Sequence, residues 1–209
     1  MVFLLRVKKV DLVGRHRDEY AAARTPRLVT AGRGRYLALT GSGDPGDPLF
    51  QVQLGAIQEL ASSLKASKKI RGKDFRIPPP EALWWEAEHG SPAVAETGSR
   101  SRWKLLLRVP NFVKPRDLAS AAEALRSRGQ GAAAGEVRLE ELREGRCIQA
   151  LHLGPPGTEA ETVERMRRAA AAQGLAFHGR HHVIYLSDPR RTAAERMRTV
   201  LRRPVRSAR

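Results

Sequence analysis

Residues 146–191 read RCIQALHLGPPGTEAETVERMRRAAAAQGLAFHGRHHVIYLSDPRR, and this stretch decides the expected fold. Residues 147–153 form a short run rich in apolar residues that ends in a Gly-Pro-Pro turn. Thr158 then opens a capping-box pattern, and an amphipathic helix is expected to run to Gly174, a typical helix stop. Residues 182–186 return as a second strand. Because a strand-helix-strand unit cannot bury its sheet face alone, this stretch needs a second copy or a partner.

A second copy is expected in the first half of the chain. Residues 35–41 read as a strand that ends in a turn rich in Gly, Asp and Pro. A helix with one apolar face follows at residues 48–64, and a basic loop at residues 65–73. The strand at residues 82–85 mirrors the one at residues 183–186. An offset of about 100 residues indicates a duplicated domain, because solenoid repeats have shorter periods.

The remaining segments complete this outline. They read as an N-terminal helix at residues 11–23, a loop at residues 86–101, a strand at residues 103–109, a helix at residues 115–128, a strand at residues 137–142, and a short closing helix at residues 192–201. The sequence therefore predicts an α+β fold of two fused strand-helix-strand-strand modules. We expect one domain over residues 1–205, with modules at about 1–113 and 114–205, and a basic tail at residues 206–209.

Composition limits the classes of protein to consider. A chain of 209 residues with 41% hydrophobic residues can bury a sizeable core. The single cysteine, Cys147, excludes an internal disulfide and fits a reducing compartment. The sequence contains no apolar run of the roughly 20 residues that a membrane span needs. We expect a cytoplasmic protein without a membrane segment.

The net charge of +16 raises the question of an anionic partner. The excess is mostly arginine and gathers at residues 65–73, 165–168 and 190–209. No helix-turn-helix, zinc-finger spacing or aromatic-rich binding strand accompanies it in the sequence. A solvated basic surface is the preferred interpretation, and a nucleic acid or an acidic partner bound by this surface is the alternative.

Several motifs resemble the GyrI-like small-molecule-binding family when taken together. They are GSGDP after a strand, IPPPEALWW, WKLLLRVPNF, EGRCIQALHLGPPGTEAETVERM, and HHVIYLSDPRR followed by RPV. The resemblance runs from about residue 10 to residue 205. It implies pseudo-twofold symmetry between the modules, an antiparallel sheet with helices on one face, and a ligand cleft between the two modules. Some stand-alone members of that family are described as hydrolases that open cyclopropane rings of DNA-alkylating natural products.

The resemblance also indicates which residues face the cleft, and where this chain departs from the family. Val183 stands where the family usually has a cleft glutamate that serves cation recognition or catalysis. Pro156 stands where a tyrosine is common, and Gln58 and Ser62 replace tyrosines of the first helix. Glu81 is the surviving carboxylate and is expected to be the counterpart of Val183. A buried carboxylate there could transfer protons, whereas a strand-edge glutamate would be solvated or paired with arginine.

Other candidate residues are open to two interpretations. Trp84 and Trp85 alternate along a strand, so only one of them can face the cleft. Trp103 and Tyr185 could contact a ligand or simply pack. His181 and His182 point to opposite faces and cannot share one metal ion without distortion. Neither a metal-ligand spacing nor a nucleophile motif is complete in the sequence, so we expect no metal and no cofactor.

The sequence thus favours a small-molecule-binding protein with an apolar cleft, which could sequester a drug-like or natural-product ligand and confer xenobiotic resistance. The expected ligand-binding residues are Gln58, Ser62, Trp84, Trp85, Trp103, Pro156, His182, Val183 and Tyr185. The first alternative is a hydrolase of strained rings with Glu81 as acid or base. The second is a basic interaction protein that binds nucleic acid or an acidic partner. The ligand and the oligomeric state stay open.

Overall fold

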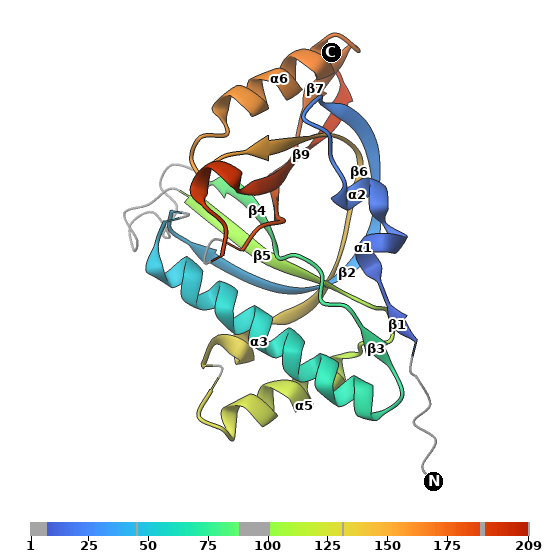
Figure 1. The fold of residues 1–209 in the computed structure, drawn as a ribbon, viewed down its shortest axis with the longest axis vertical. Coiled ribbons are helices and arrows are strands. Elements are labelled where there is room, and N and C mark those ends of the chain that lie inside the picture. The colour runs from blue at the N-terminus through green and yellow to red at the C-terminus, as the bar shows by residue number, and fades with distance from the viewer. Residues whose placement is uncertain (1–7, 45, 88–100, 131, 189–190, 209) are drawn as a thin grey trace.

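The structure is a computed structural model, and it describes residues 8–44, 46–87, 101–130, 132–188 and 191–208. The order strand-helix-strand-strand occurs twice along the chain (Figure 1). The first set is β2 (Arg27–Ser42), α3 (Pro48–Ile70), β4 (Glu81–Glu86) and β5 (Ser101–Val109). The second set is β6 (Arg138–Leu153), α6 (Ala160–Ala171), β8 (His181–Tyr185) and β9 (Arg198–Ser207). The predicted α+β fold with an antiparallel sheet is confirmed.

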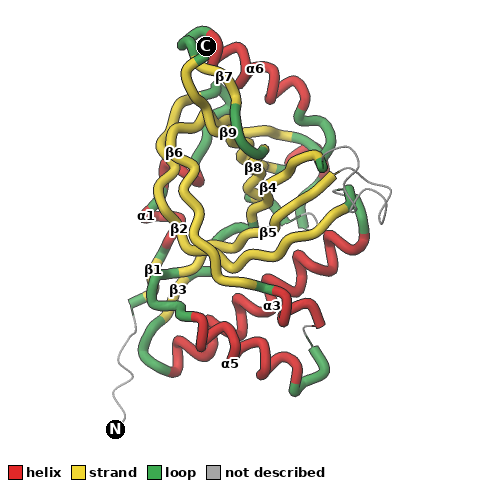
Figure 2. The backbone as a smooth tube through the Cα atoms, turned by 180° about the vertical axis from the view of Figure 1, so that it is seen from behind, coloured by secondary structure: helices red, strands yellow, loops and turns green. Residues whose placement is uncertain are grey.

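Six of the strands close into a ring. Their order is β6-β2-β5-β4-β8-β9, and β9 pairs again with β6. All pairs in this ring are antiparallel. The two sets of elements join through β2 with β6 and through β4 with β8. A closed ring leaves no unpaired edge among these six strands, and Figure 2 shows it as a curved wall of strands around the centre of the molecule.

The longer helices cover the outer face of the ring (Figure 1). Helix α3 packs with α5 (Pro115–Arg126) over β2 and β5, in a cluster that includes Ile57 and Leu105. Helix α6 packs through Met166 over β8 and β9, in a second cluster with Leu201. Neighbouring residues of the same strands point inward. The two outer clusters meet at the junction of β4 and β8, which we call the seam.

The short helices α1 (Leu12–Arg15) and α2 (Arg17–Tyr20) pack against the inner face of the ring. Tyr20 contacts Ile184 and Val200, whose neighbours Val183 and Leu201 belong to the outer cluster under α6.

The remaining elements are β1 (Lys9–Val10), β3 (Asp74–Phe75), β7 (Leu175–Phe177), η1 (Ala132–Glu136) and η2 (Ala194–Arg196). In the described part of the chain, no helix is both long and apolar enough to cross a membrane.

Three of the expected helices differ from those in the structure. The expected helix at residues 11–23 is two four-residue helices that end at Tyr20. Helix α3 continues to Ile70, through the segment expected to be a basic loop, because buried Lys68 lies 2.6 Å from the carboxylate of Asp117 on α5. Helix α6 begins at Ala160, two residues after Thr158, which was expected to cap it.

The C-terminal segment also differs from its expected structure. In place of a helix at residues 192–201 and a tail, η2 is followed by β9, which runs to Ser207. Strand β9 pairs with β6, β7 and β8, and its Val200, Leu201 and Val205 are buried. Pairing on both sides therefore outweighs the local helical preference. Most of the predicted loop at residues 86–101 lies outside the described residues.

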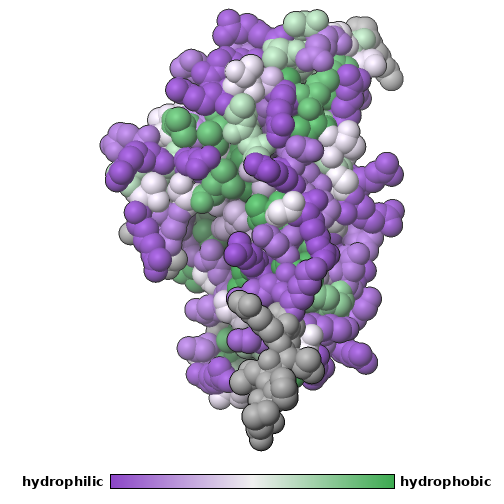
Figure 3. Space-filling view, turned by 45° about the vertical axis from the view of Figure 1, so that its right-hand side comes forward, coloured by the Kyte–Doolittle hydropathy of each residue, from purple (hydrophilic) through white to green (hydrophobic). Residues whose placement is uncertain are grey.

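Hydrophilic side chains cover much of the surface in Figure 3, in keeping with the net charge of +16. Apolar side chains gather in a band between hydrophilic neighbours in the upper half of this face. Among the described residues, the large exposed apolar side chains include Leu49, Val52 and Ile70 on α3. Scattered exposed apolar residues of this kind are normal for a folded protein.

Candidate functional site

The seam holds a group of aromatic side chains. Trp84 of β4 and Tyr185 of β8 are half-buried, and each contacts both outer clusters. The Trp84 Nε1–H donates a hydrogen bond to the Tyr185 hydroxyl over 3.3 Å. The ring of Phe50, from the first turn of α3, lies 5.1 Å from that of Trp84 and 6.4 Å from that of Tyr185. Elements of both halves therefore build one aromatic surface.

Trp103 lies behind this surface and is fully buried. Its ring meets that of Phe50 edge-on at 5.3 Å. On the neighbouring strand β2 the ring lies directly over Gly41, where a Cβ atom would come within 2.2 Å of it. The indole Nε1 is buried without a hydrogen-bond partner in the described part of the chain. Trp103 thus supports Phe50 through packing and offers no exposed surface.

The other outer-face candidates differ in exposure. Val183 is buried on the same face of β8 as Tyr185, under α6. Gln58 is half-buried on α3, and Ser62 is exposed one turn later, where its hydroxyl donates to the Gln58 carbonyl oxygen over 2.9 Å. Pro156 is exposed in the turn before α6. The structure therefore gathers Trp84, Tyr185 and Val183 at the seam, with Ser62 and Pro156 at the surface.

Glu81, Trp85 and His182 lie on the inner face of the ring. The register of β4 with β8 pairs Glu81 with Ile184 and Ala82 with Val183. Ala82 therefore lies beside Val183, and Glu81, which was expected to be the counterpart of Val183 in the first module, lies on the opposite face of the sheet. Because strand side chains alternate between faces, this difference of one residue moves the carboxylate from the outer face to the inner face. Trp85 is half-buried there, with the exposed Arg180 guanidinium 3.7 Å from its ring.

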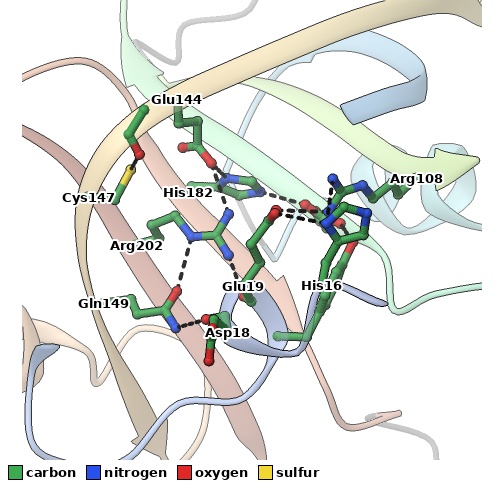
Figure 4. Close-up of polar contacts among 12 residues, drawn as sticks. His16, Asp18, Glu19, Arg108, Glu144, Cys147, Gln149, His182 and Arg202 are labelled. Carbon is green, nitrogen blue, oxygen red and sulfur yellow. Dashed lines mark hydrogen bonds and ion pairs between the residues drawn. The ribbon is translucent and has the colours of Figure 1, made fainter. Parts of the chain in front are cut away.

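Glu81 and His182 belong to a buried polar network beneath α1 and α2. Figure 4 labels His182 and several other members of this network. The Tyr20 hydroxyl donates to Glu81 Oε1 over 2.6 Å. His182 Nδ1 lies 2.8 Å from Glu144 Oε2. His182 Nε2 lies 2.9 Å from Glu81 Oε2, an ion-pair contact in which the imidazole N–H is not aimed at the oxygen. The His182 ring is thus held between two carboxylates, both on buried side chains.

Two buried arginines extend this network to the N-terminal segment. Arg202 contacts Glu144 Oε2 over 2.9 Å and also donates to the backbone oxygen of Glu19. Arg108 donates to Glu19 Oε2 over 2.8 Å. The Gln149 side chain accepts from Arg202 and donates to the backbone oxygen of Asp18 over 2.7 Å. Through these contacts, residues 18–20 are tied to strands β4, β5, β6 and β9.

The two members of the His182–Glu144 pair shift each other's pKa. Burial alone would lower the pKa of His182, but the charges of Glu144 and Glu81 outweigh burial and raise it to about 9. Burial alone would raise the pKa of Glu144, but His182 and Arg202 lower it to about 2. Near neutral pH the imidazole is therefore protonated between two carboxylates. A cation held in this way stabilises the fold and is a poor general base.

Sequence reasoning missed most of this network, although a signal for it exists. Arg108 and Arg202 each interrupt an apolar strand, in LLLRVP and VLRRPV. Both lie at inward positions, where a buried charge needs a partner. Placing Glu19 and Glu144 as those partners requires the closure of the ring, which no local pattern specifies.

Metal and thiol chemistry find little support in the described residues. They contain no group of three or more His, Cys, Asp or Glu side chains that could hold a metal ion. The Cys147 thiol is buried, and burial is the main reason that its pKa rises to about 12. The thiol is thus a weak nucleophile at neutral pH.

The comparisons with known proteins agree with this architecture. The family model of the GyrI-like small molecule binding domain matches residues 111–206 of this chain. An uncharacterized conserved protein from Listeria innocua is 32% identical, with a TM-score of 0.84, over 95% of this chain and 100% of its own. A hydrolase from Listeria innocua is 31% identical, with a TM-score of 0.83 and the same coverage.

Similarity in fold extends further than similarity in sequence. The EcmrR C-terminal domain, at 8% identity and a TM-score of 0.57 over 88% of this chain and 98% of its own, shares the fold alone. A comparison with curated proteins gave no match. Identity above 30% over the full length of the Listeria proteins, together with the match of the second half of the chain, shows that this chain belongs to the GyrI-like small-molecule-binding domain family.

Proposed function

We propose that this chain binds an uncharged, aromatic small molecule at the seam, against Trp84 and Tyr185. The observation that carries the proposal is the half-buried Trp84–Tyr185 pair, which bridges the two outer clusters and packs on Phe50. Half-buried aromatic rings offer large apolar contact areas together with polar atoms that can orient a ligand. Pockets between packed elements are common places for such ligands.

The charges at the seam favour a neutral ligand over a cation. Val183 is apolar, and Ala82 lies directly beside it. The inner-face carboxylate of Glu81 points away from the seam and is engaged by Tyr20 and His182. Among the described residues, Glu159 is the carboxylate whose charge acts on Tyr185, and it already accepts from the Gly157 amide over 2.8 Å. A lipophilic cation at the seam would therefore gain its attraction chiefly from the aromatic faces. The Tyr185 hydroxyl already accepts from Trp84, so it can still donate its own proton to an acceptor on the ligand.

Adjacent tryptophans provide a matched test. Nile red, a neutral aromatic dye, is titrated into wild type, Trp84→Leu and Trp85→Leu, and its fluorescence is followed. We expect Trp84→Leu to weaken binding about fivefold or more, because stacking on one aromatic ring is worth about 1–3 kcal/mol. Trp85→Leu, on the inner face, should leave the Kd within about twofold of wild type. Equal losses in both variants, with circular dichroism showing both folded, would reject the seam as the site.

A second titration tests the charge preference. Tetraphenylphosphonium, a lipophilic cation, should bind wild type more weakly than Nile red does. Val183→Glu places a carboxylate on the outer face of β8 and should improve cation binding relative to the neutral dye. Unchanged relative affinities in a folded Val183→Glu protein would contradict the neutral-ligand proposal.

Hydrolysis of a strained ring is the second candidate function. Hydrolysis in general is supported by the likeness to Listeria innocua proteins described as hydrolases, at 31% identity, and the strained ring as substrate comes from the family resemblance alone. Glu81 is the candidate acid or base, but only 1% of the residue is exposed, and it lies under Tyr20. A substrate would reach this carboxylate only if residues 12–20 moved away from the inner face.

Turnover separates the two candidates. A cyclopropane-bearing DNA alkylator is incubated with wild type and with Glu81→Gln, and the products are analysed by mass spectrometry for addition of water. Water addition by wild type that is lost in Glu81→Gln would support hydrolysis. Recovery of intact, protein-bound compound with both proteins would support binding alone.

A further inference from the structure

A cavity lies at the end of the molecule that carries α6. It measures about 400 Å³ and is lined by Arg167 and Ala171 of α6, by β7, and by Ala208. Its walls are apolar except for Arg167. The volume falls at the small end of the range for ligand sites, about 300 to 1,000 Å³. The cavity shares no lining residue with the seam.

Two arginines lie near the ring of Phe177, which is one of the cavity's walls; Arg167 is itself a lining residue and Arg203 is not. The guanidinium of Arg167 lies 5.8 Å from the ring centroid and that of Arg203 lies 5.6 Å from it. Arg203 is half-buried, and its Nε is a buried donor without a hydrogen-bond partner in the described part of the chain. A buried donor left unpaired is costly unless an acceptor reaches it.

These two guanidinium groups repel each other. Burial and then the charge of Arg167 lower the pKa of Arg203. Among the described residues, the Arg203 side chain donates only to the Gly179 carbonyl oxygen, over 3.4 Å. Arg167 contacts Glu164 over 3.2 Å, but both of those side chains are at least half exposed, so that ion pair is weak. The apolar cavity therefore has a rim with an excess of positive charge.

We propose that this cavity is a second binding site, for a small anionic amphiphile such as a medium-chain carboxylate. The anionic head group contacts Arg167 and Arg203, and the apolar chain packs on Leu175, Ala171 and Phe177. Guanidinium groups suit this role because they present several fixed donors to a carboxylate. The site is independent of the seam, so neither proposal depends on the other.

The probe is decanoate, and its binding is measured by isothermal titration calorimetry. Decanol and decyltrimethylammonium carry the same chain with a neutral and a cationic head. We expect decanoate to bind at least tenfold more tightly than either, because hydrogen bonds to charged groups are worth about 1.5–3 kcal/mol. No decanoate binding, or equal binding of decanol, would overturn the proposal.

Variants locate the site. Arg203→Gln and Arg167→Gln should each weaken decanoate binding about tenfold, and Ala171→Phe should abolish it by filling the cavity. Arg168→Gln is the matched control, because Arg168 is an exposed arginine on the same helix outside the lining. Decanoate binding that is lost equally in Arg168→Gln, or retained in Arg203→Gln and Arg167→Gln, would overturn the assignment. Trp84→Leu should bind decanoate normally, so failure at the seam and failure here are distinguishable.

Discussion

Removing a single hydroxyl from Tyr20 tests how the N-terminal segment is held. The Tyr20 hydroxyl donates to Glu81 Oε1 over 2.6 Å, and both residues are buried. Tyr20→Phe keeps the ring packed on Ile184 and Val200 but leaves one carboxylate oxygen without this donor. A hydrogen bond to a charged group contributes about 1.5–3 kcal/mol, so we expect the free energy of unfolding to fall by about 2 kcal/mol.

The assay is urea unfolding at pH 7, followed by circular dichroism. With a slope of about 2 kcal/mol per molar urea, the midpoint should fall by about 1 M while the slope stays the same. Tyr36→Phe is the control, because Tyr36 is also buried on the inner face but makes no hydrogen bond through its hydroxyl within the described structure. It should change stability by no more than about 0.5 kcal/mol.

Limited trypsin digestion provides a second readout of the same variant. Arg15 and Arg17 are exposed in the short helices that the Tyr20–Glu81 hydrogen bond holds in place. Cleavage at these arginines should be faster in Tyr20→Phe than in Tyr36→Phe, since proteolysis follows local opening. If the two variants show the same midpoint and the same cleavage rate, the network does not anchor the N-terminal segment and the reasoning is wrong.

Three further predictions concern stability and reactivity. His182 has a pKa of about 9, above its ordinary value of 6.5. Its contribution to the free energy of unfolding, on the order of 3 kcal/mol, should therefore be complete below pH 6.5 and lost as the pH rises to 9. Unfolding measured from pH 6 to 9.5 should show this loss of stability in wild type and not in His182→Gln. Gly41→Ala should destabilise the protein by about 2 kcal/mol or more, because the added methyl overlaps the Trp103 ring, and a thermal melt that matches wild type would contradict the described packing. Cys147 should resist iodoacetamide in the native state and react once urea unfolds the chain, because the pKa of the buried thiol is about 12. Labelling is followed by mass spectrometry over time, and rapid labelling of the native protein would show that the inner face is open.

The order of elements could be predicted because each signal is local. Asp47 and Pro48 start α3, where the Asp47 side chain accepts from the Leu49 amide, and apolar spacing defines its buried face. The strands around Tyr36 and Val183 read from short apolar runs between turn residues. Strand β9 could not be predicted in this way. Its charged residues conceal a strand that is fixed by pairing on both sides.

The candidate site shows the limit of sequence reasoning more sharply. Trp84 and Tyr185 are placed together at the seam. Glu81 and His182, each three residues earlier on the same strand, face inward. Side chains alternate with a period of two, so a register error of one residue exchanges the two faces of the ring. The resemblance suggested Glu81 as the counterpart of Val183, whereas the register gives that place to Ala82.

The most direct test of the ligand site is the indole N–H region of the proton–nitrogen NMR spectrum during titration with Nile red. The chain has three tryptophans, so three indole signals are expected, and single Trp→Phe variants assign them. If the seam is the site, the Trp84 signal should shift in a saturable way while the Trp85 signal stays in place. A saturable shift of the Trp85 signal with an unmoved Trp84 signal would place the ligand on the inner face and contradict the account.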